Sequence, residues 1–495
     1  MKFIIHPLLF VLSFAMAASA RQPNIVFILA DDLGWSDTTL YGTTAYYETP
    51  HIQALVDQGM LLRQAYTASP VCSPTRASIM SGNYPSRYGI TQARCGGGEV
   101  RLEANPVEKD SPNRTTLELL TATRFPTDVY TLTEFLKDNG YLTAHFGKWH
   151  LGAEPYSPYE QGFDVDIPHT YGGFGDNFIA PWSNKDLQKL PHKDGDHIED
   201  IMAEQAADFI KVHAKDDKPF FLNYWAFSVH SPWYAKESYA KEFLAKRDPL
   251  NPQSNPVYAG MVKSFDDAVG TIVAALKDEG IFDNTLIIFT SDNGGNTWGP
   301  PANKTGPSFG ADIPGTCNFP LRDGKGSLYE GGIRVPTAFV WPKKIPASEV
   351  TDEMFNSVDY FPTIASLIGL EMPSDLKIDG MDLSKILSGK KGDRNEQFYY
   401  YPHYSGMNPG PVAGVRVNDW KLLRYFHANI DQTHLIELYN LDKDIIERQN
   451  VASRYPEIVK QLSARLDYYI EKTQTTVPIP NPVYPKQKVT KQTWR

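Results

Sequence analysis

The sequence predicts an α/β fold in which a large mixed, mostly parallel β-sheet is sandwiched by helices, with a smaller C-terminal α+β subdomain that contains an antiparallel sheet. Three observations lead to this prediction. Short apolar runs of strand length alternate with helical segments over most of the chain, as expected when helices connect parallel strands. After about residue 385 this alternation ends. The length of 495 residues also exceeds what one ordinary hydrophobic core accommodates.

The first expected strand is the apolar run NIVFILA at residues 24–30, which suits a strand buried on both faces. A helix is expected after Thr49, because threonine is a favoured N-cap and Pro50 suits the first helical position. Residues 91–127 are expected to form a long loop, and such loops in compact domains are usually functional. In chain order, further helices are expected within residues 74–82, 131–140, 257–279 and 357–370, and further strands within residues 141–150, 218–230, 284–291 and 331–342.

The C-terminal subdomain is expected from the change in pattern. Short antiparallel strands are expected within residues 396–406, 412–420 and 421–426, and a helix over roughly residues 455–471. The polar, glycine-containing stretch ILSGKKGDRNE connects these elements to the main part of the chain. We therefore expect a main domain over residues 21–385 and a subdomain over residues 386–495.

The N-terminus suggests export. Lys2 precedes an apolar run over residues 8–18, and ASA at residues 18–20 suits a cleavage site, so residues 1–20 have the pattern of a secretory signal peptide. No cysteine follows the cleavage site directly, which argues against a lipoprotein anchor. No later apolar run is long enough to cross a bilayer. We expect an exported protein, periplasmic or secreted, without a membrane anchor.

The composition excludes one class of partner and constrains the cysteines. A formal net charge of −10 leaves no basic excess to neutralise phosphates, which argues against nucleic-acid binding. An anionic substrate would have to be held by local arginine and lysine side chains. Three cysteines are an odd number for an oxidising compartment, so at least one is expected outside a disulfide.

Polar residues follow two of the apolar strands. Asp31 and Asp32 come directly after the first strand, and Asp292 and Asn293 follow the strand within residues 284–291. Each pair alone could consist of turn or capping residues. Open α/β sheets bind ligands at the carboxyl ends of their strands, where the two pairs would meet. Carboxylate and amide oxygens suit Ca²⁺ or Mg²⁺, so a metal site is expected there.

Four further residues could join this site. Lys148 and His150 in GKWHLG lie on the same side of an extended segment, although they could equally be a surface pair. His230 stands where the apolar run FFLNYWAFSVH ends, and could simply cap a strand. Lys325 lies between glycines that leave room for a ligand, but a solvated loop would look the same.

The stretch CSPTR at residues 72–76 resembles the signature of the type I sulfatases, a family of the alkaline phosphatase superfamily. Thr75 stands where serine is commoner in that family, while the proline and the arginine are in place. The resemblance covers nearly the whole chain after residue 20 and implies an alkaline-phosphatase-like sheet. Five other blocks in family order carry it: PNIVFILADDLGW, GKWHLG, SDNGG, GKGSLYEGGIRVP and ELYNLDKDIIERQNVA.

The resemblance implies a specific chemistry. In this family a maturation enzyme oxidises the signature cysteine, here Cys72, to the aldehyde formylglycine. One hydroxyl of the hydrated aldehyde attacks sulfur, and loss of a proton from the second hydroxyl then expels sulfate. The implied ligands of one Ca²⁺ ion are Asp31, Asp32, residue 72, Asp292 and Asn293. The implied catalytic residues are Cys72, Arg76, Lys148, His150, His230 and Lys325.

The resemblance also implies a role for each of these side chains. Arg76 and the metal would lower the cost of forming the attacking alkoxide. Lys148 and Lys325 would surround the sulfate oxygens and stabilise their charge. His230, with Lys325, would protonate the leaving oxygen, and His150 would take the proton from the second hydroxyl.

The expected substrate is a sulfated carbohydrate, such as an extracellular polysaccharide or its oligosaccharides. Arg94, His403 and Arg424 are candidates for binding carboxylate or neighbouring sulfate groups. Two other functions remain open: a phosphoester or phosphonate hydrolase of the same superfamily, and an inactive protein that binds sulfated glycans. With Cys72 consumed, an oxidising compartment would favour pairing Cys95 with Cys317, although two separate buried thiols are the alternative.

Overall fold

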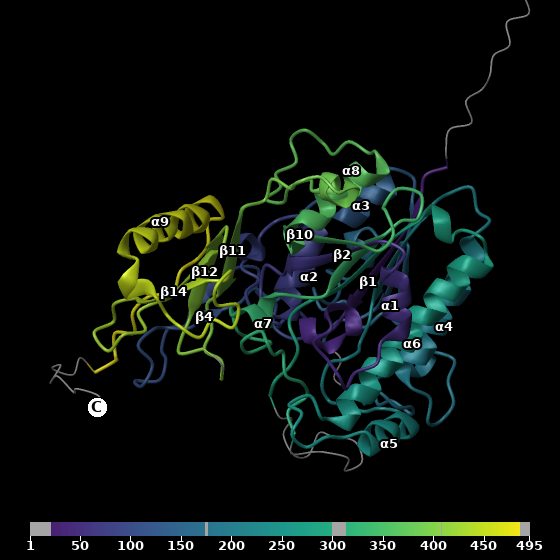
Figure 1. Ribbon diagram of the computed structural model, residues 1–495. Coiled ribbons are helices and arrows are strands. Elements are labelled where there is room, and N and C mark those ends of the chain that lie inside the picture. The colour runs from purple at the N-terminus through teal and green to yellow at the C-terminus, as the bar shows by residue number, and fades with distance from the viewer. Residues whose placement is uncertain (1–20, 174–176, 299–312, 407, 486–495) are drawn as a thin grey trace, which may run out of the picture.

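A computed structural model describes residues 21–173, 177–298, 313–406 and 408–485 of the protein. The expected signal peptide, residues 1–20, lies outside these ranges. The predicted fold class is confirmed: an eight-stranded sheet lies between layers of helices, and a four-stranded antiparallel sheet forms a smaller unit beside it (Figure 1). Within the described ranges we find no helix whose length and apolar character would suit a membrane span.

The large sheet has the strand order β10-β2-β9-β8-β1-β7-β5-β6. Strand β1 is central and pairs in parallel with β8 on one side and β7 on the other. Only β9 runs against its neighbours β2 and β8 among the described strands, so the sheet is mixed but mostly parallel. The strands are β1 (Asn24–Ala30), β2 (Met60–Tyr66), β5 (Leu142–Gly147), β6 (Val165–Ile167), β7 (Phe220–Trp225), β8 (Thr285–Ser291), β9 (Thr337–Val340) and β10 (Glu349–Asn356).

Both faces of the large sheet are covered, which explains the unbroken apolar character of β1. Val26 and Ile28 pack into one core cluster, and Phe27 and Leu29 pack into another on the opposite face. The first cluster is closed by α1 (Pro50–Val56), α4 (Ile198–His213), α5 (Glu237–Ala245) and α6 (Pro256–Asp278). The second is closed by α2 (Cys72–Ser81), α3 (Leu132–Asp138) and α8 (Tyr360–Ile368).

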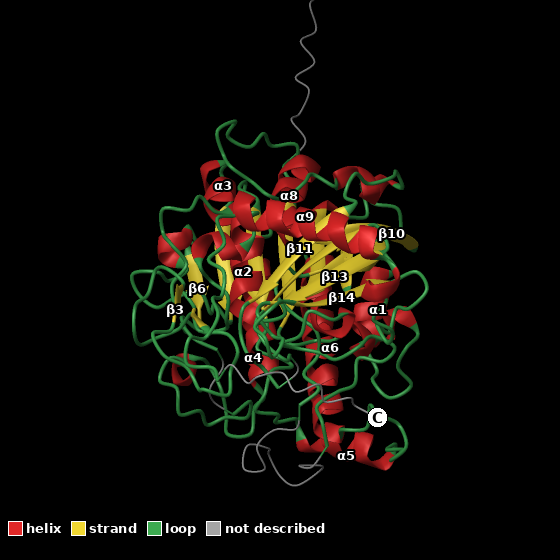
Figure 2. Ribbon diagram, turned by 90° about the vertical axis from the view of Figure 1, so that its left-hand side faces the viewer, coloured by secondary structure: helices red, strands yellow, loops and turns green. Residues whose placement is uncertain are grey.

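The C-terminal unit contains one strand more than the three expected. Its antiparallel order is β11-β12-β13-β14, with bounds β11 (Glu396–Tyr401), β12 (Val412–Val417), β13 (Trp420–Tyr425) and β14 (Leu435–Asn440). The edge strand β14 is only half-buried along most of its length, so its sequence lacks a clear apolar run. Helix α9 (Pro456–Lys472) lies across the outer face of this sheet (Figure 2).

The expected loop at residues 91–127 is largely irregular, but it holds two short paired strands, β3 (Asn105–Pro106) and β4 (Leu119–Leu120). It is anchored by the segment that follows α9. The backbone N–H of Leu117 donates to the carbonyl of Ile479, and that of Asn481 donates to Thr115, both at 2.9 Å. The loop is therefore joined to the C-terminal unit.

A buried ion cluster fastens the small sheet to the main part. Lys421 on β13 places its Nζ 3.0 Å from Oε1 of Glu330 and 2.8 Å from Oε1 of Glu447. Glu330 opens α7 (Glu330–Ile333), and its Oε2 accepts a 2.7 Å hydrogen bond from the Tyr66 hydroxyl on β2. All these side chains are fully or almost fully buried. Burial raises the pKa of Glu447 to about 7, so Lys421 chiefly balances the charge of Glu330.

We predict that Lys421→Met lowers the free energy of unfolding by about 3 kcal/mol, because it removes the nearest cation from the buried carboxylate of Glu330 and leaves only Arg334, 3.6 Å away, as an ion-pair partner. Urea denaturation measures this loss. Lys241→Met is the matched control, since it breaks the exposed pair with Glu237 on α5 and should cost less than about 1 kcal/mol. Equal losses in the two variants would show that the buried ion pairs of Lys421 contribute no more to stability than the exposed pair of Lys241.

Candidate active site

The carboxyl ends of β1 and β8 bring four polar residues together. The two strands pair in parallel with Ala30 opposite Ser291, so the residues that follow them lie side by side. Asn293 donates from Nδ2 to Oδ1 of Asp32 at 2.8 Å, and the backbone N–H of Asp32 donates to Oδ1 of Asp292 at 3.2 Å. Asp31, Asp32, Asp292 and Asn293 are all completely buried.

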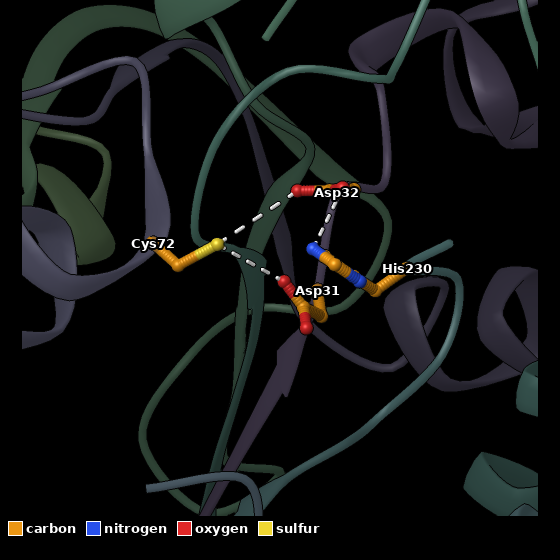
Figure 3. A group of neighbouring side chains, drawn as sticks. All are labelled: Asp31, Asp32, Cys72 and His230. Atoms are coloured by element: carbon orange, nitrogen blue, oxygen red, sulfur yellow. Dashed lines mark hydrogen bonds and ion pairs between the residues drawn. The ribbon is translucent and has the colours of Figure 1, made fainter. Parts of the chain in front are cut away.

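Cys72 faces this acidic group from the first position of α2 (Figure 3). Its Sγ lies 3.4 Å from Oδ1 of Asp31 and 4.0 Å from Oδ1 of Asp32. Burial, together with the charges of Asp292 and Asp31, raises the pKa of the thiol far above its usual range. These surroundings favour the neutral thiol form of the cysteine.

Arg76 stands one helical turn after Cys72, so both point to the same side of α2. Its Nε and Nη2 donate to Oδ2 of Asp292 at 3.0 and 2.8 Å, and its Nη1 donates to the backbone carbonyl of Lys148 at 2.5 Å. The guanidinium also lies over the Trp225 ring, 5.0 Å from its centre. Arg76 thus joins α2 to the ends of β8, β5 and β7.

Two lysines neutralise the paired aspartates. Lys148, just after β5, places its Nζ 2.5 Å from Oδ2 of Asp31 and 3.5 Å from the Cys72 sulfur. Lys325 reaches in from the segment before α7, with its Nζ 2.8 Å from Oδ2 of Asp32. Burial alone would raise the pKa of Asp31, but Lys148 and the neighbouring cations outweigh it and hold that pKa well below the usual range.

His230 follows β7 and places its Nε2 3.7 Å from Oδ2 of Asp32 (Figure 3). Its Nδ1 hydrogen-bonds the carbonyl oxygen of Ser231, which requires a proton on Nδ1. Burial and the charge of Lys325 lower the pKa of His230 to about 4. The ring is therefore neutral and turns its unprotonated Nε2 toward the site.

His150 lies at the end of the GKWH segment in the left-handed backbone region, with φ of 58°. It is 7 % exposed, and its Nδ1 has no hydrogen-bond partner among the described residues. Burial and the charges of Lys148 and Arg76 lower its pKa well below the usual range. The imidazole of His150 is therefore in its neutral form.

The carboxylate and amide oxygens at this site fit a hard divalent cation. One ligand atom from each of Asp31, Asp32, Cys72 and His230 lies within 4.8 Å of the others, and of these the two aspartates supply hard oxygen ligands. Oδ1 of Asn293 is buried and has no hydrogen-bond partner in the described part of the chain. Such an oxygen, set beside several carboxylates, matches the ligands that Ca²⁺ prefers.

Two of the three candidates for binding substrate anions are engaged elsewhere. His403 is buried, with its Nε2 2.9 Å from the Thr91 hydroxyl and its Nδ1 3.3 Å from a carboxylate oxygen of Glu118. Arg424 points to α9, where it pairs with Asp467 at 2.5 Å. These two side chains therefore already have protein partners in this structure, whereas Arg94 is exposed.

The predicted pairing of Cys95 with Cys317 is also wrong, because all three cysteines are free. Cys95 packs in the core cluster with α3 and α8. The carbonyl oxygen of Cys317 accepts a 3.0 Å hydrogen bond from Gln253, just before α6 on the opposite layer. The two cysteines therefore have different surroundings and do not form a disulfide in this structure.

Supporting residues without a clear sequence signal lie behind the site. The Tyr258 hydroxyl donates to Oδ2 of Asp37 at 2.6 Å and contacts the backbone carbonyl of Asp32 at 3.2 Å. Glu199 on α4 accepts hydrogen bonds from the backbone N–H groups of Phe227 and Ser228. Asp37 resembles a turn residue in the sequence, and Glu199 resembles an exposed acid in the first turn of a helix.

Two family models match the chain: Sulfatase over residues 23–370, and N-sulphoglucosamine sulphohydrolase, C-terminal, over residues 323–472. N-acetylgalactosamine-6-sulfatase of Rattus norvegicus is 33% identical, and the match covers 92% of this chain and 88% of that protein. A sulfatase of Formosa agariphila is 31% identical over 88% of this chain and 85% of its own length. Human arylsulfatase A is 30% identical over 90% and 87%, respectively.

Solved structures agree with this assignment. The crystal structure of Ps i-CgsB in complex with k-i-k-neocarrahexaose matches with a TM-score of 0.73 and 27% identity, over 92% of this chain and 94% of that one. The phosphonate monoester hydrolase of Agrobacterium radiobacter shares the fold, with a TM-score of 0.64 and 18% identity over 93% and 99%. The chain belongs to the sulfatase family of the alkaline phosphatase superfamily and is an enzyme that hydrolyses sulfate esters.

Proposed function

We propose that this sulfatase is exported, that it removes sulfate from a sulfated polysaccharide or its oligosaccharides, and that it uses a formylglycine made from Cys72 together with a bound Ca²⁺ ion. We also propose that residues 21–385 form the catalytic domain and residues 386–495 a subdomain beside it.

The observation that carries the proposal is the state of Cys72. A fully buried thiol beside carboxylates, with a strongly raised pKa, is a poor nucleophile. The same position at the start of α2 faces Lys148 and the acidic group, where a nucleophile would be needed. As its hydrate, formylglycine supplies one hydroxyl oxygen that attacks sulfur and displaces the alcohol, and a second hydroxyl whose deprotonation re-forms the aldehyde and expels sulfate from the first oxygen.

The metal would be held by Asp31, Asp32, Asp292 and Asn293 together with residue 72. A divalent cation there supplies positive charge that stabilises developing negative charge on oxygen. Arg76 already fixes the orientation of Asp292 through two hydrogen bonds. Lys148 and Lys325 would turn from their aspartates toward the sulfate oxygens and stabilise their charge.

The two histidines suit opposite proton transfers. The Nε2 of His230 faces the site and would carry the proton that goes to the leaving oxygen, because a bound sulfate ester adds negative charge that favours the protonated ring. His150 is held neutral by burial, and its unpartnered Nδ1 would accept the proton that must leave before sulfate is released.

A carbohydrate substrate is supported by the surroundings of Lys325 and by the relatives. Trp298 is 41% exposed and lies against Gly326, where an added Cβ would meet its ring at 3.3 Å. An exposed aromatic face suits the apolar face of a sugar ring. Ser405 and Asn408 of the C-terminal unit hydrogen-bond the Gly326 carbonyl. Ps i-CgsB, the related protein described above, was crystallised with a neocarrahexaose.

The formylglycine proposal is tested on residue 72 itself. We expect the peptide containing residue 72, from protein made together with a maturation enzyme, to carry an aldehyde that reacts with hydrazides. Cys72→Ala should fold and bind Ca²⁺ but lose all turnover of 4-nitrophenyl sulfate. Substantial activity in this variant, measured as sulfate release, would refute the mechanism.

The metal proposal predicts a thermal shift that does not depend on activity. Ca²⁺ added to EDTA-treated Cys72→Ala protein should raise the melting temperature, since a ligand at about 100 times its Kd stabilises by roughly 2.7 kcal/mol. Asp31→Asn should abolish the shift. Asp266→Asn alters another acidic group, formed with His51 and Asp267, and should leave the shift intact. If Asp266→Asn abolished the thermal shift and Asp31→Asn kept it, the metal would bind at the other acidic group.

The substrate proposal predicts a difference between large and small substrates. Trp298→Ala should raise KM for multiply sulfated oligosaccharides while leaving 4-nitrophenyl sulfate unaffected. Raising the ionic strength should likewise weaken binding of the oligosaccharides more, because an acidic protein must hold a polyanion through local cations. If no sulfated glycan in a defined panel outperforms the aryl sulfate, the carbohydrate assignment fails.

A further inference from the structure

The carboxylate of Glu199 links helix α4 to the turn that carries His230. Glu199 is the second residue of α4 and is completely buried. Its Oε1 accepts hydrogen bonds from the backbone N–H groups of Phe227 at 2.9 Å and Ser228 at 2.8 Å. Its Oε2 accepts a 3.1 Å hydrogen bond from the Tyr224 hydroxyl on β7. The side chain thus spans the space between the helical layer and the end of the sheet.

The same turn is hydrogen-bonded to the backbone of Asp31. The N–H of Asp31 donates to the Ser228 carbonyl at 2.9 Å, and the N–H of Val229 donates to the Asp31 carbonyl at 2.7 Å. The N–H of His230 donates to the Phe227 carbonyl at 3.3 Å. The two peptide units that Glu199 holds are therefore connected directly to one aspartate of the acidic group and to one histidine of the site.

The contacts of Glu199 are directed at the backbone and a hydroxyl. In the described part of the chain it forms no ion pair within 4.0 Å. Its position in the first turn of α4 favours a negative charge. Burial raises the pKa of this carboxyl to about 7, although the hydrogen bonds from the two backbone N–H groups act in the opposite direction. Removing it would leave two buried N–H groups without an acceptor, so the turn would have to shift or admit water.

We propose that Glu199 is a positioning residue of the active site, which fixes the turn at residues 227–229 and thereby sets the orientation of His230 and the backbone of Asp31. The inference rests on the proposed role of His230 as the group that protonates the leaving oxygen. Glu199 itself does not touch substrate in this assignment.

The test compares kcat for a series of aryl sulfates with increasing phenol pKa, from 4-nitrophenyl sulfate to phenyl sulfate. Poorer leaving groups need more proton donation, so misplacing His230 should steepen the dependence of kcat on leaving-group pKa. We expect Glu199→Ala to lose about tenfold more on phenyl sulfate than on 4-nitrophenyl sulfate, as part of the roughly 10²-fold that such proton transfer contributes. Glu199→Gln retains an acceptor oxygen and should restore the wild-type slope.

Asp266 on α6 supplies a matched control. Its side chain is also buried. Its two carboxylate oxygens accept hydrogen bonds from the backbone N–H groups of His51 at 3.1 Å and Ile52 at 2.8 Å, at the start of α1. Asp266→Ala should lower the melting temperature but leave the slope unchanged. Hydrogen exchange gives a second readout: amides of residues 226–230 should exchange faster in Glu199→Ala, but not in Glu199→Gln or Asp266→Ala.

The outcomes separate this inference from the proposed function. His230→Ala should give a steeper slope than any Glu199 variant; if it leaves the slope unchanged, the role of His230 fails. If His230→Ala steepens the slope but Glu199→Ala does not, the positioning role is refuted. Should Glu199→Ala not fold, Glu199→Asp withdraws the carboxylate by one methylene while keeping its charge, and a wild-type slope in that variant refutes the proposal equally.

Discussion

The balance of buried charge at the carboxyl ends of β1 and β8 is the interaction on which the centre of the molecule depends. Asp31, Asp32 and Asp292 are completely buried, and an isolated carboxylate could not remain ionised there. Three cations meet them: Arg76 from α2, Lys148 from the end of β5 and Lys325 from the segment before α7. Because each cation comes from a different element, charge balance is satisfied only when these elements are assembled correctly.

These buried ion pairs favour the correct assembly of the centre but contribute little net free energy to folding. Burying paired ions is often no better than packing apolar groups of similar volume, so these charges are better explained by chemistry than by folding. The backbone supports this interpretation. Asp32 and His150 both adopt positive φ, at 65° and 58°, and such conformations persist in non-glycine residues only where the surroundings hold them. The contacts from Arg76, Tyr258 and the turn after β7 provide that support.

The C-terminal unit is coupled to the site by polar contacts that lie close to Lys325. Ser405 and Asn408 bind the carbonyl of Gly326, and Lys421 pairs with Glu330 at the start of α7. The segment that delivers Lys325 is therefore held between the two sheets. A displacement of the small sheet would move this lysine relative to Asp32, which connects the stability of the C-terminal unit to the geometry of the site.

The sequence by itself determined the fold class, the central strands and the residues that gather at their ends. A strand buried on both faces appears as an unbroken apolar run, and the run at residues 24–30 followed by two aspartates shows both its burial and its end. Only the tertiary structure decided the order of the strands, the half-buried edge strand β14, and the burial of Glu199 beneath the turn before His230. It also left Cys95 and Cys317 unpaired and turned Arg424 toward α9. These features depend on contacts between segments far apart in the chain, and the local sequence pattern does not indicate which segments will be in contact.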